Sequence, residues 1–178
     1  MYKRQPLTPS IGAEISGISL NDELNDDAIE QVYNSLIKHQ VIFFRNQNLS
    51  PESHLKLAES LGEIDPGHPV YPHVDGYQSI VLLRNDTNNR PDTADWHKDL
   101  TFKANPPFAS ILHGIKVPKS GGDTLWASMS AAYDQLPDGW KDYLEGLEAI
   151  HDMGTFRNDY YKEGGVESVS YTHLTLPT

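Results

Sequence analysis

The order of predicted elements changes along the chain, and this change constrains the fold more than any other feature. Helices and strands are interspersed in the first part, where apolar residues at helical spacing predict a helix over residues 29–37. A continuous apolar run predicts a buried strand over residues 41–44, and Ser50-Pro51 and Gly62 have the residue types that begin and end a helix. Strand then follows strand with longer loops. This order favours an α+β fold with an antiparallel sandwich or barrel over a regular βαβ alternation.

The remaining predicted elements are short. Residues 64–76 contain three prolines and two glycines, which predicts a loop. Two helices are expected after residue 128, over residues 129–136 and 139–147. A further strand is expected to begin over residues 147–151. Short apolar or alternating runs predict the other strands, which cover residues 11–20, 79–83, 96–102, 109–117 and 124–127.

Charge and composition exclude several classes of protein. The net charge of −11 and the lack of a Lys/Arg cluster argue against nucleic-acid binding. Cysteine is absent, which removes disulfides, thiolate ligands and a cysteine nucleophile. No run approaches the roughly 20 apolar residues that span a bilayer, and the N-terminal residues lack the apolar core of a signal peptide. We expect a soluble, cytoplasmic protein that does not bind membranes.

One β-prone run carries a possible metal site. In Trp96-His97-Lys98-Asp99-Leu100-Thr101-Phe102, His97 and Asp99 are two residues apart. Alternate side chains of a strand share a face, so this imidazole and this carboxylate would project together. They would supply two thirds of a 2-His-1-carboxylate triad, which holds non-haem Fe(II) with open positions. The spacing alone also fits a structural histidine that a neighbouring carboxylate orients.

Two loops and one further histidine have both a structural and a functional interpretation. His68 and Tyr71 lie on a loop that two prolines stiffen, and they could line an anion pocket or belong to an ordinary surface turn. A tight turn is predicted at Gly121-Gly122-Asp123-Thr124. In the structural interpretation its glycines supply only the positive φ that the turn needs, and in the functional one it also directs the Thr124 hydroxyl into a site. His113 lies in an apolar run and is expected to be a core or wall histidine rather than a ligand.

Together these motifs resemble a known family. The chain is similar to the Fe(II)- and 2-oxoglutarate-dependent dioxygenases of the taurine dioxygenase group, which includes 2,4-dichlorophenoxyacetate dioxygenases and alkylsulfatases. The similarity runs from about Leu7 to Asp152. The motifs that carry it are Ile11-Gly12-Ala13-Glu14-Ile15-Ser16-Gly17, His39-Gln40-Val41-Ile42-Phe43-Phe44-Arg45, His68-Pro69-Val70-Tyr71-Pro72-His73, Trp96-His97-Lys98-Asp99, Pro106-Pro107 and Gly121-Gly122-Asp123-Thr124-Leu125-Trp126.

The resemblance assigns roles to individual residues. It implies that His97 and Asp99 bind Fe(II) and that Thr124 contacts the 2-oxoglutarate carboxylate. His68 and Tyr71 match positions that line a sulfonate pocket, and Phe102 matches an aromatic wall beside it. Thr93 and Leu100 depart from taurine dioxygenase itself: the family has an asparagine at the first position and a smaller apolar residue at the second. These two departures concern the choice of substrate, not the chemistry.

Part of the family pattern is not found in this chain. The second iron histidine and the 2-oxoglutarate-binding arginine of the family lie about a hundred residues or more beyond residue 178, and His173 comes too early to match. We therefore predict that residues 1–167 are the N-terminal part of one domain and that residues 168–178 are unrelated sequence or, alternatively, an exposed terminal strand. The complete fold would be a double-stranded β-helix (jelly roll) with flanking helices, incomplete at the C-terminus here.

The implied function is hydroxylation of a small anionic substrate with 2-oxoglutarate and O2. Taurine or a related alkylsulfonate, hydroxylated beside the sulfonate with release of sulfite, is the first hypothesis. The alternatives are an aryloxyalkanoate, an alkylsulfate or another small acid. A further hypothesis is that the 178-residue chain is a catalytically inactive fragment. The full-length protein is expected to form a homo-oligomer.

Overall fold

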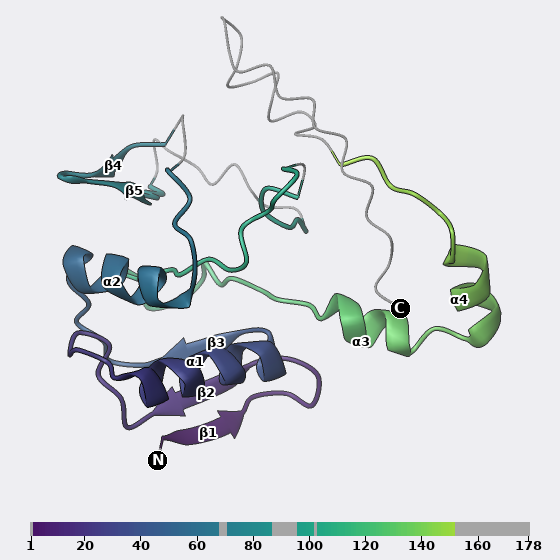
Figure 1. Cartoon of the computed structure of the whole chain (residues 1–178), viewed down its shortest axis with the longest axis horizontal. Coiled ribbons are helices and arrows are strands. Elements are labelled where there is room, and N and C mark those ends of the chain that lie inside the picture. The colour runs from purple at the N-terminus through teal and green to yellow at the C-terminus, as the bar shows by residue number, and fades with distance from the viewer. Residues whose placement is uncertain (1, 68–70, 87–95, 102, 152–178) are drawn as a thin grey trace, which may run out of the picture. The chain divides into compact units, whose positions relative to one another are not determined.

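The structure is a computed structural model that describes residues 2–67, 71–86, 96–101 and 103–151 (Figure 1). These residues belong to two units. The first contains residues 1–64 and 111–136, and the second contains residues 65–110 and 137–178. Among the described residues, no helix is both long enough and apolar enough to cross a membrane.

A three-stranded sheet forms the base of the first unit. Strand β1 (Lys3–Pro6) pairs antiparallel with β2 (Ala13–Ser16), and β2 pairs in parallel with β3 (Ile42–Phe44). The parallel pair is joined by helix α1 (Asp26–His39), which lies against the sheet (Figure 1). Such a crossover is the ordinary way to connect parallel strands. The predicted buried strand over residues 41–44 is confirmed as β3.

Both long helices begin at residues whose side chains cap a helix, and α2 also ends at a glycine. Asn25 caps α1 by accepting a hydrogen bond from the amide of Ala28 at 2.9 Å. Helix α2 (Pro51–Leu61) is capped by Ser50, whose hydroxyl accepts from the amide of Ser53 at 3.1 Å, and it ends at Gly62. Side-chain oxygens at the N-cap satisfy amides that have no partner inside the helix. The predicted helix limits at Ser50 and Gly62 are therefore confirmed.

The core of the first unit is built from the N-terminal 60 residues. Ala13 and Ile15 of β2 are buried, as are Ala28 and Val32 of α1. A second cluster joins Leu20 and Leu49 to Leu57 of α2, and its partly buried neighbours are Ile18, Leu24, Phe44, Leu61 and Ile111. Removal of this apolar surface from water is the main favourable contribution to the folding of the unit.

The second unit contains a hairpin of β4 (His73–Val74) and β5 (Tyr77–Val81). The amide of Leu82 donates to the carbonyl of Pro72 at 2.7 Å, which extends the pairing beyond β4. Two short helices come later in the chain: α3 (Met129–Asp134) in the first unit and α4 (Asp138–Leu144) in the second. The predictions of a strand near residues 79–83 and of both late helices are confirmed, with shifted ends.

Several predicted strands are wrong. Residues 96–101, 109–117 and 124–127 contain no strand, and neither do residues 147–151. A strand satisfies its backbone groups by pairing with a neighbour, and no segment in the described ranges pairs with any of these runs. The described residues therefore show an α+β arrangement with two small sheets, and the predicted jelly roll is not among them.

Candidate functional site

His97 and Asp99 approach each other as predicted, although the local structure differs from the prediction. His97 Nε2 lies 3.3 Å from Asp99 Oδ1. Residues 96–98 have no regular structure, and Asp99 and Leu100 form a turn in which Leu100 has φ 52°. The two side chains therefore meet across a turn and not through the alternation of a pleated strand. They are 52% and 65% exposed, respectively, so a ligand could reach both.

The donor atoms of this pair suit a first-row metal ion. An imidazole nitrogen and a carboxylate oxygen are two of the three donors of the facial triad that binds Fe(II). Adjacent ligands about 2.1 Å from an octahedral ion lie about 3 Å apart, which is close to the observed separation. The same contact also fits a carboxylate that orients a histidine. No cluster of three or more His, Cys, Asp or Glu side chains that could hold a metal occurs among the described residues.

The turn that carries Asp99 has two contacts to distant parts of its own unit. Thr101 Oγ1 is hydrogen-bonded to His151 Nδ1 at 2.9 Å. Lys103 Nζ forms an ion pair with Asp65 Oδ2. Neither contact was predicted, because the partners are 50 and 38 residues apart and the sequence carries no signal for either pairing beyond opposite charge.

The other predicted site residues fall into different parts of the chain. Tyr71 is half-buried, next to Pro72 at the start of the hairpin. Thr124 is exposed, follows two glycines with φ of 76° and 70°, and belongs to the first unit, whereas His97 and Asp99 belong to the second. The prediction of positive φ at these two glycines is confirmed. His68, Thr93 and Phe102 lie outside the described residues.

One histidine outside the predicted site has a perturbed pKa. His54 of α2 donates from Nε2 to the carbonyl of Ile111 at 3.1 Å, and its ring meets that of His113 edge-on, with centroids 6.4 Å apart. Burial lowers the pKa of His54. The hydrogen bond to Ile111 raises this pKa in part, and the charge of His113 lowers it further. His113 is partly buried, and its expected role as a core or wall histidine stays a prediction.

Comparison with known proteins identifies the family. The profile described as "Taurine catabolism dioxygenase TauD, TfdA family" matches residues 3–174. The chain therefore belongs to this family of alpha-ketoglutarate-dependent dioxygenases. The predicted boundary at residue 167 lies inside the matched range, and the origin of residues 168–178 stays a prediction.

Individual relatives sharpen the comparison. The chain is 38% identical to an alkylsulfatase of Acinetobacter baylyi, over 94% of this chain and 51% of the relative. It is 40% identical to an alpha-ketoglutarate-dependent sulfate ester dioxygenase of Pseudomonas putida, over 82% of this chain and 48% of the relative. A crystal structure of a taurine dioxygenase from Burkholderia xenovorans matches with a TM-score of 0.75 at 36% identity. The match covers 85% of this chain and 54% of the solved chain. The chain thus spans about half the length of the relatives it matches.

Proposed function

We propose that this chain is the N-terminal half of a dioxygenase domain that oxidises a small organosulfur anion. The observation that carries the proposal is the convergence of His97 Nε2 and Asp99 Oδ1 in a chain of this family. His97 and Asp99 would hold Fe(II), which together with 2-oxoglutarate would supply an oxidant derived from O2, with succinate and CO2 as co-products. The remaining protein ligand, a histidine, and an arginine for 2-oxoglutarate would come from sequence beyond residue 178.

The other site residues would bind and orient the two organic molecules. Thr124 would donate a hydrogen bond to a carboxylate of 2-oxoglutarate. His68 and Tyr71 would hold the anionic head group of the substrate, and Phe102 would form an apolar wall beside its alkyl chain. Such placement and the exclusion of water direct the oxidant to the substrate and away from solvent.

Within this class, a sulfate ester is the substrate best supported by the relatives. The two curated relatives at 38–40% identity are named for sulfate esters, whereas the solved taurine dioxygenase is 36% identical. Hydroxylation of the carbon bonded to the ester oxygen gives an unstable adduct that releases sulfate and an aldehyde. The same step on a sulfonate releases sulfite. Taurine and other alkylsulfonates remain the second candidates because of the solved structure.

A product assay separates the two candidates. The protein translated from the complete reading frame is incubated anaerobically with Fe(II) and 2-oxoglutarate, and air is then admitted with hexyl sulfate, hexanesulfonate or taurine. We expect succinate and inorganic sulfate from the ester, and only uncoupled background from taurine. Sulfite release from a sulfonate, with no turnover of the ester, would reverse the order of the candidates. Succinate formation that no organosulfur anion stimulates would contradict the substrate class.

The 178-residue chain by itself is expected to show no 2-oxoglutarate turnover, because in this proposal the third iron ligand and the 2-oxoglutarate-binding arginine come from sequence beyond residue 178. Turnover by this chain would contradict the proposal that sequence beyond residue 178 completes the site. The reading frame downstream of Glu167 offers an independent check, and we expect it to encode the distal histidine and arginine.

A further inference from the structure

The turn that carries Asp99 has an unfavourable backbone conformation. Leu100 has φ 52°, in the left-handed region that side chains with a Cβ seldom adopt, and the amide of Lys103 donates to the carbonyl of Leu100 at 3.1 Å. Residues held in this region persist where the surrounding structure fixes them. Contacts outside the turn must therefore contribute to its shape.

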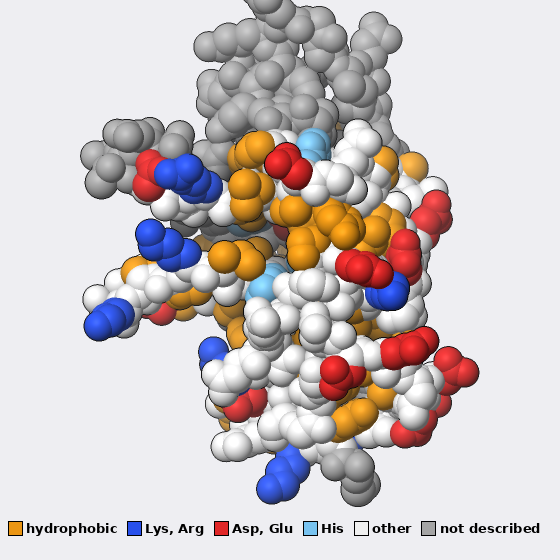
Figure 2. Space-filling view, turned by 90° about the vertical axis from the view of Figure 1, so that its left-hand side faces the viewer, with side chains coloured by type: hydrophobic (Ala, Val, Ile, Leu, Met, Phe, Trp, Pro, Cys, Tyr) orange, Lys and Arg blue, Asp and Glu red, His pale blue; other side chains and the backbone are white. Residues whose placement is uncertain are grey.

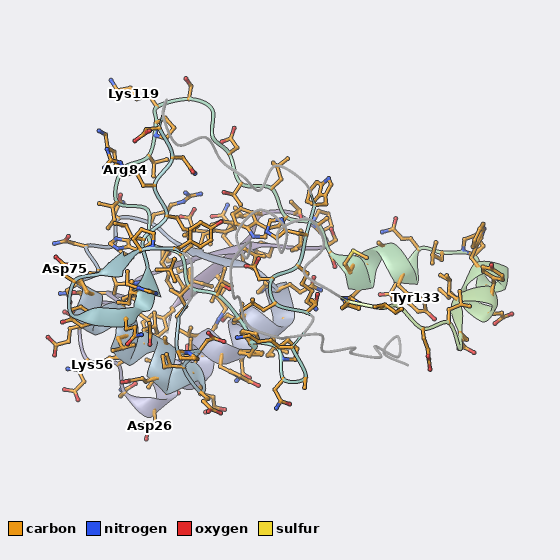
Figure 3. The ribbon with its side chains drawn as sticks, turned by 90° about the horizontal axis from the view of Figure 1, so that it is seen from above. Asp26, Lys56, Asp75, Arg84, Lys119 and Tyr133 are labelled. Atoms are coloured by element: carbon orange, nitrogen blue, oxygen red, sulfur yellow. The ribbon has the colours of Figure 1, made fainter. Side chains whose placement is uncertain are left out.

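The Lys103–Asp65 ion pair is one such contact. Lys103 Nζ binds Asp65 Oδ2, and Asp65 Oδ1 accepts a hydrogen bond from the amide of Gly67 at 3.3 Å. A single carboxylate thus binds both the Asp99 turn and the backbone that leads toward the hairpin. The lysine and aspartate side chains are 36% and 30% exposed. The Lys56–Glu52 pair on α2 is more open to solvent, because its side chains are 72% and 66% exposed (Figure 3 labels Lys56).

The Gly67 end of this connection is itself fixed. Gly67 has φ 103°, and a Cβ at this position would lie 2.5 Å from the carbonyl oxygen of Gln78 and 3.2 Å from His73 Nε2. Its backbone therefore packs directly on β5. Gly67, Asp65 and Lys103 form a continuous connection from the hairpin to the turn, all within the second unit.

We infer that Asp65 and Lys103 are positioning residues for the metal site: their ion pair holds the Asp99 turn at the base of the β4–β5 hairpin and so sets where the Asp99 carboxylate lies relative to His97. The inference rests on the proposed role of Asp99 as a metal ligand. Neither residue touches the metal in this scheme. Their effect passes through the hydrogen bond from the Lys103 amide to the Leu100 carbonyl.

The first experiment measures the turn without metal. Amide hydrogen exchange of Lys103 is followed by NMR in the 178-residue chain and in Lys103→Met, which keeps the alkyl stem but removes the charge. We expect roughly two- to fivefold faster exchange, since a partly exposed ion pair contributes up to about 1 kcal/mol. Lys103→Arg keeps the charge and is expected to restore slow exchange. Lys56→Met is the matched control. Unchanged exchange in Lys103→Met would overturn the inference.

The second experiment measures the metal site. Co(II), a spectroscopic substitute for Fe(II), is titrated into the same chains, and the visible absorption of the complex reports affinity and ligand geometry. Direct partners of metal ligands affect affinity about 10–100-fold, and this pair acts one step further away. We therefore expect about three- to tenfold weaker binding and an altered spectrum in Lys103→Met. Asp65→Asn, which retains the acceptor for Gly67, is expected to behave in the same way.

A double-variant cycle and one comparison complete the test. The combination of Asp65→Asn and Lys103→Met is expected to bind Co(II) as weakly as either single variant, because both remove one interaction. If the His97→Ala variant binds Co(II) with wild-type affinity, the proposed metal site itself is contradicted. A His97-dependent site whose affinity and spectrum are the same in Lys103→Met would overturn only the positioning role of the ion pair.

Discussion

Residues 13–61 and residues 96–151 behave differently although both are rich in apolar side chains. The buried hydrophobic core residues of the described chain all lie between Ala13 and Leu57. The later region instead carries most of the exposed large hydrophobic residues, and hydrophobic side chains are visible on the surface in Figure 2. These exposed residues include Trp96, Leu112, Ile115, Leu125, Met129, Trp140 and Ile150.

The difference shows what an apolar pattern can determine alone. In the first region the pattern is accompanied by caps and by partners within about 45 residues of sequence, so β2, α1, β3 and α2 enclose their own core. In the later region Ile111 packs against the core of the first unit and Trp126 meets Phe43 edge-on. Most other large apolar side chains of this region are exposed, and its described residues form no strand. The proposed continuation of the domain beyond residue 178 offers a reason, because further strands there would cover these side chains.

The largest expected contrast comes from matched leucine truncations. Leu57 is buried with Leu20 and Leu49, whereas Leu125 is 70% exposed. Leu57→Ala should lower the free energy of unfolding by about 2–4 kcal/mol, because it removes buried contacts and leaves a cavity. Leu125→Ala should change it by less than about 0.5 kcal/mol. Urea unfolding followed by far-UV circular dichroism measures both. Equal losses would show that the later region has a core of its own.

The β4–β5 hairpin lies between these two regions in the sequence. It depends on close backbone packing, since no side chain of β4 or β5 is fully buried. Gly67→Ala should destabilise the hairpin by at least about 2 kcal/mol, since a Cβ would overlap the carbonyl of Gln78 and the φ of 103° is strained. The control is Gly76→Ala, with φ 80° and open space around it, at about 1 kcal/mol. Amide exchange of Leu82 reports the effect, and similar exchange rates in the two variants would contradict the close packing at Gly67.

The two serine caps test the comparison on a smaller scale. Ser50 caps α2, an 11-residue helix with a buried leucine, while Ser128 caps α3, a six-residue helix with no buried residue. Ser50→Ala should cost about 1 kcal/mol of unfolding free energy. Ser128→Ala should reduce helix content locally with a smaller effect on global unfolding, because α3 buries none of its side chains. A larger global loss from Ser128→Ala would reverse the comparison.

The smallest expected effect concerns His54, which links α2 to Ile111 of the later region. Its folded-state pKa lies below the ordinary value of 6.5, so the unfolded chain binds a proton more readily. Stability should therefore fall as pH is lowered through 6.5 and level off below the folded pKa. His54→Gln retains a donor for Ile111 and should weaken this pH dependence of urea unfolding. The same dependence in the variant would exclude His54 as its source.

The sequence predicted the elements whose partners and caps are local. The helix limits at Ser50 and Gly62, the strand before Arg45 and the glycine conformations before Thr124 all follow from nearby residue types. The sequence pattern also predicted that the side chains of His97 and Asp99 would meet, but on the same face of a strand. A turn at Leu100 brings them together instead, because residues two apart can share a side in either conformation.

Contacts between distant residues could not be predicted from residue types. Nothing in the sequence joins Asp65 to Lys103 or Thr101 to His151, because an ion pair or a hydrogen bond between distant residues leaves no periodic pattern. The strands predicted after residue 96 are wrong for a related reason. Their β-prone composition is real, but a strand also needs a neighbour, and composition does not identify one.

Metal binding tests the central claim most directly. Fe(II) is titrated anaerobically into the protein translated from the complete reading frame and into its His97→Ala and Asp99→Ala variants, with His113→Ala as the control. We expect one Fe(II) per chain in the wild type and the control, and at least about tenfold weaker binding in the other two variants, because each lacks a ligand. Wild-type affinity in His97→Ala or Asp99→Ala would contradict the assignment of this pair as the iron site.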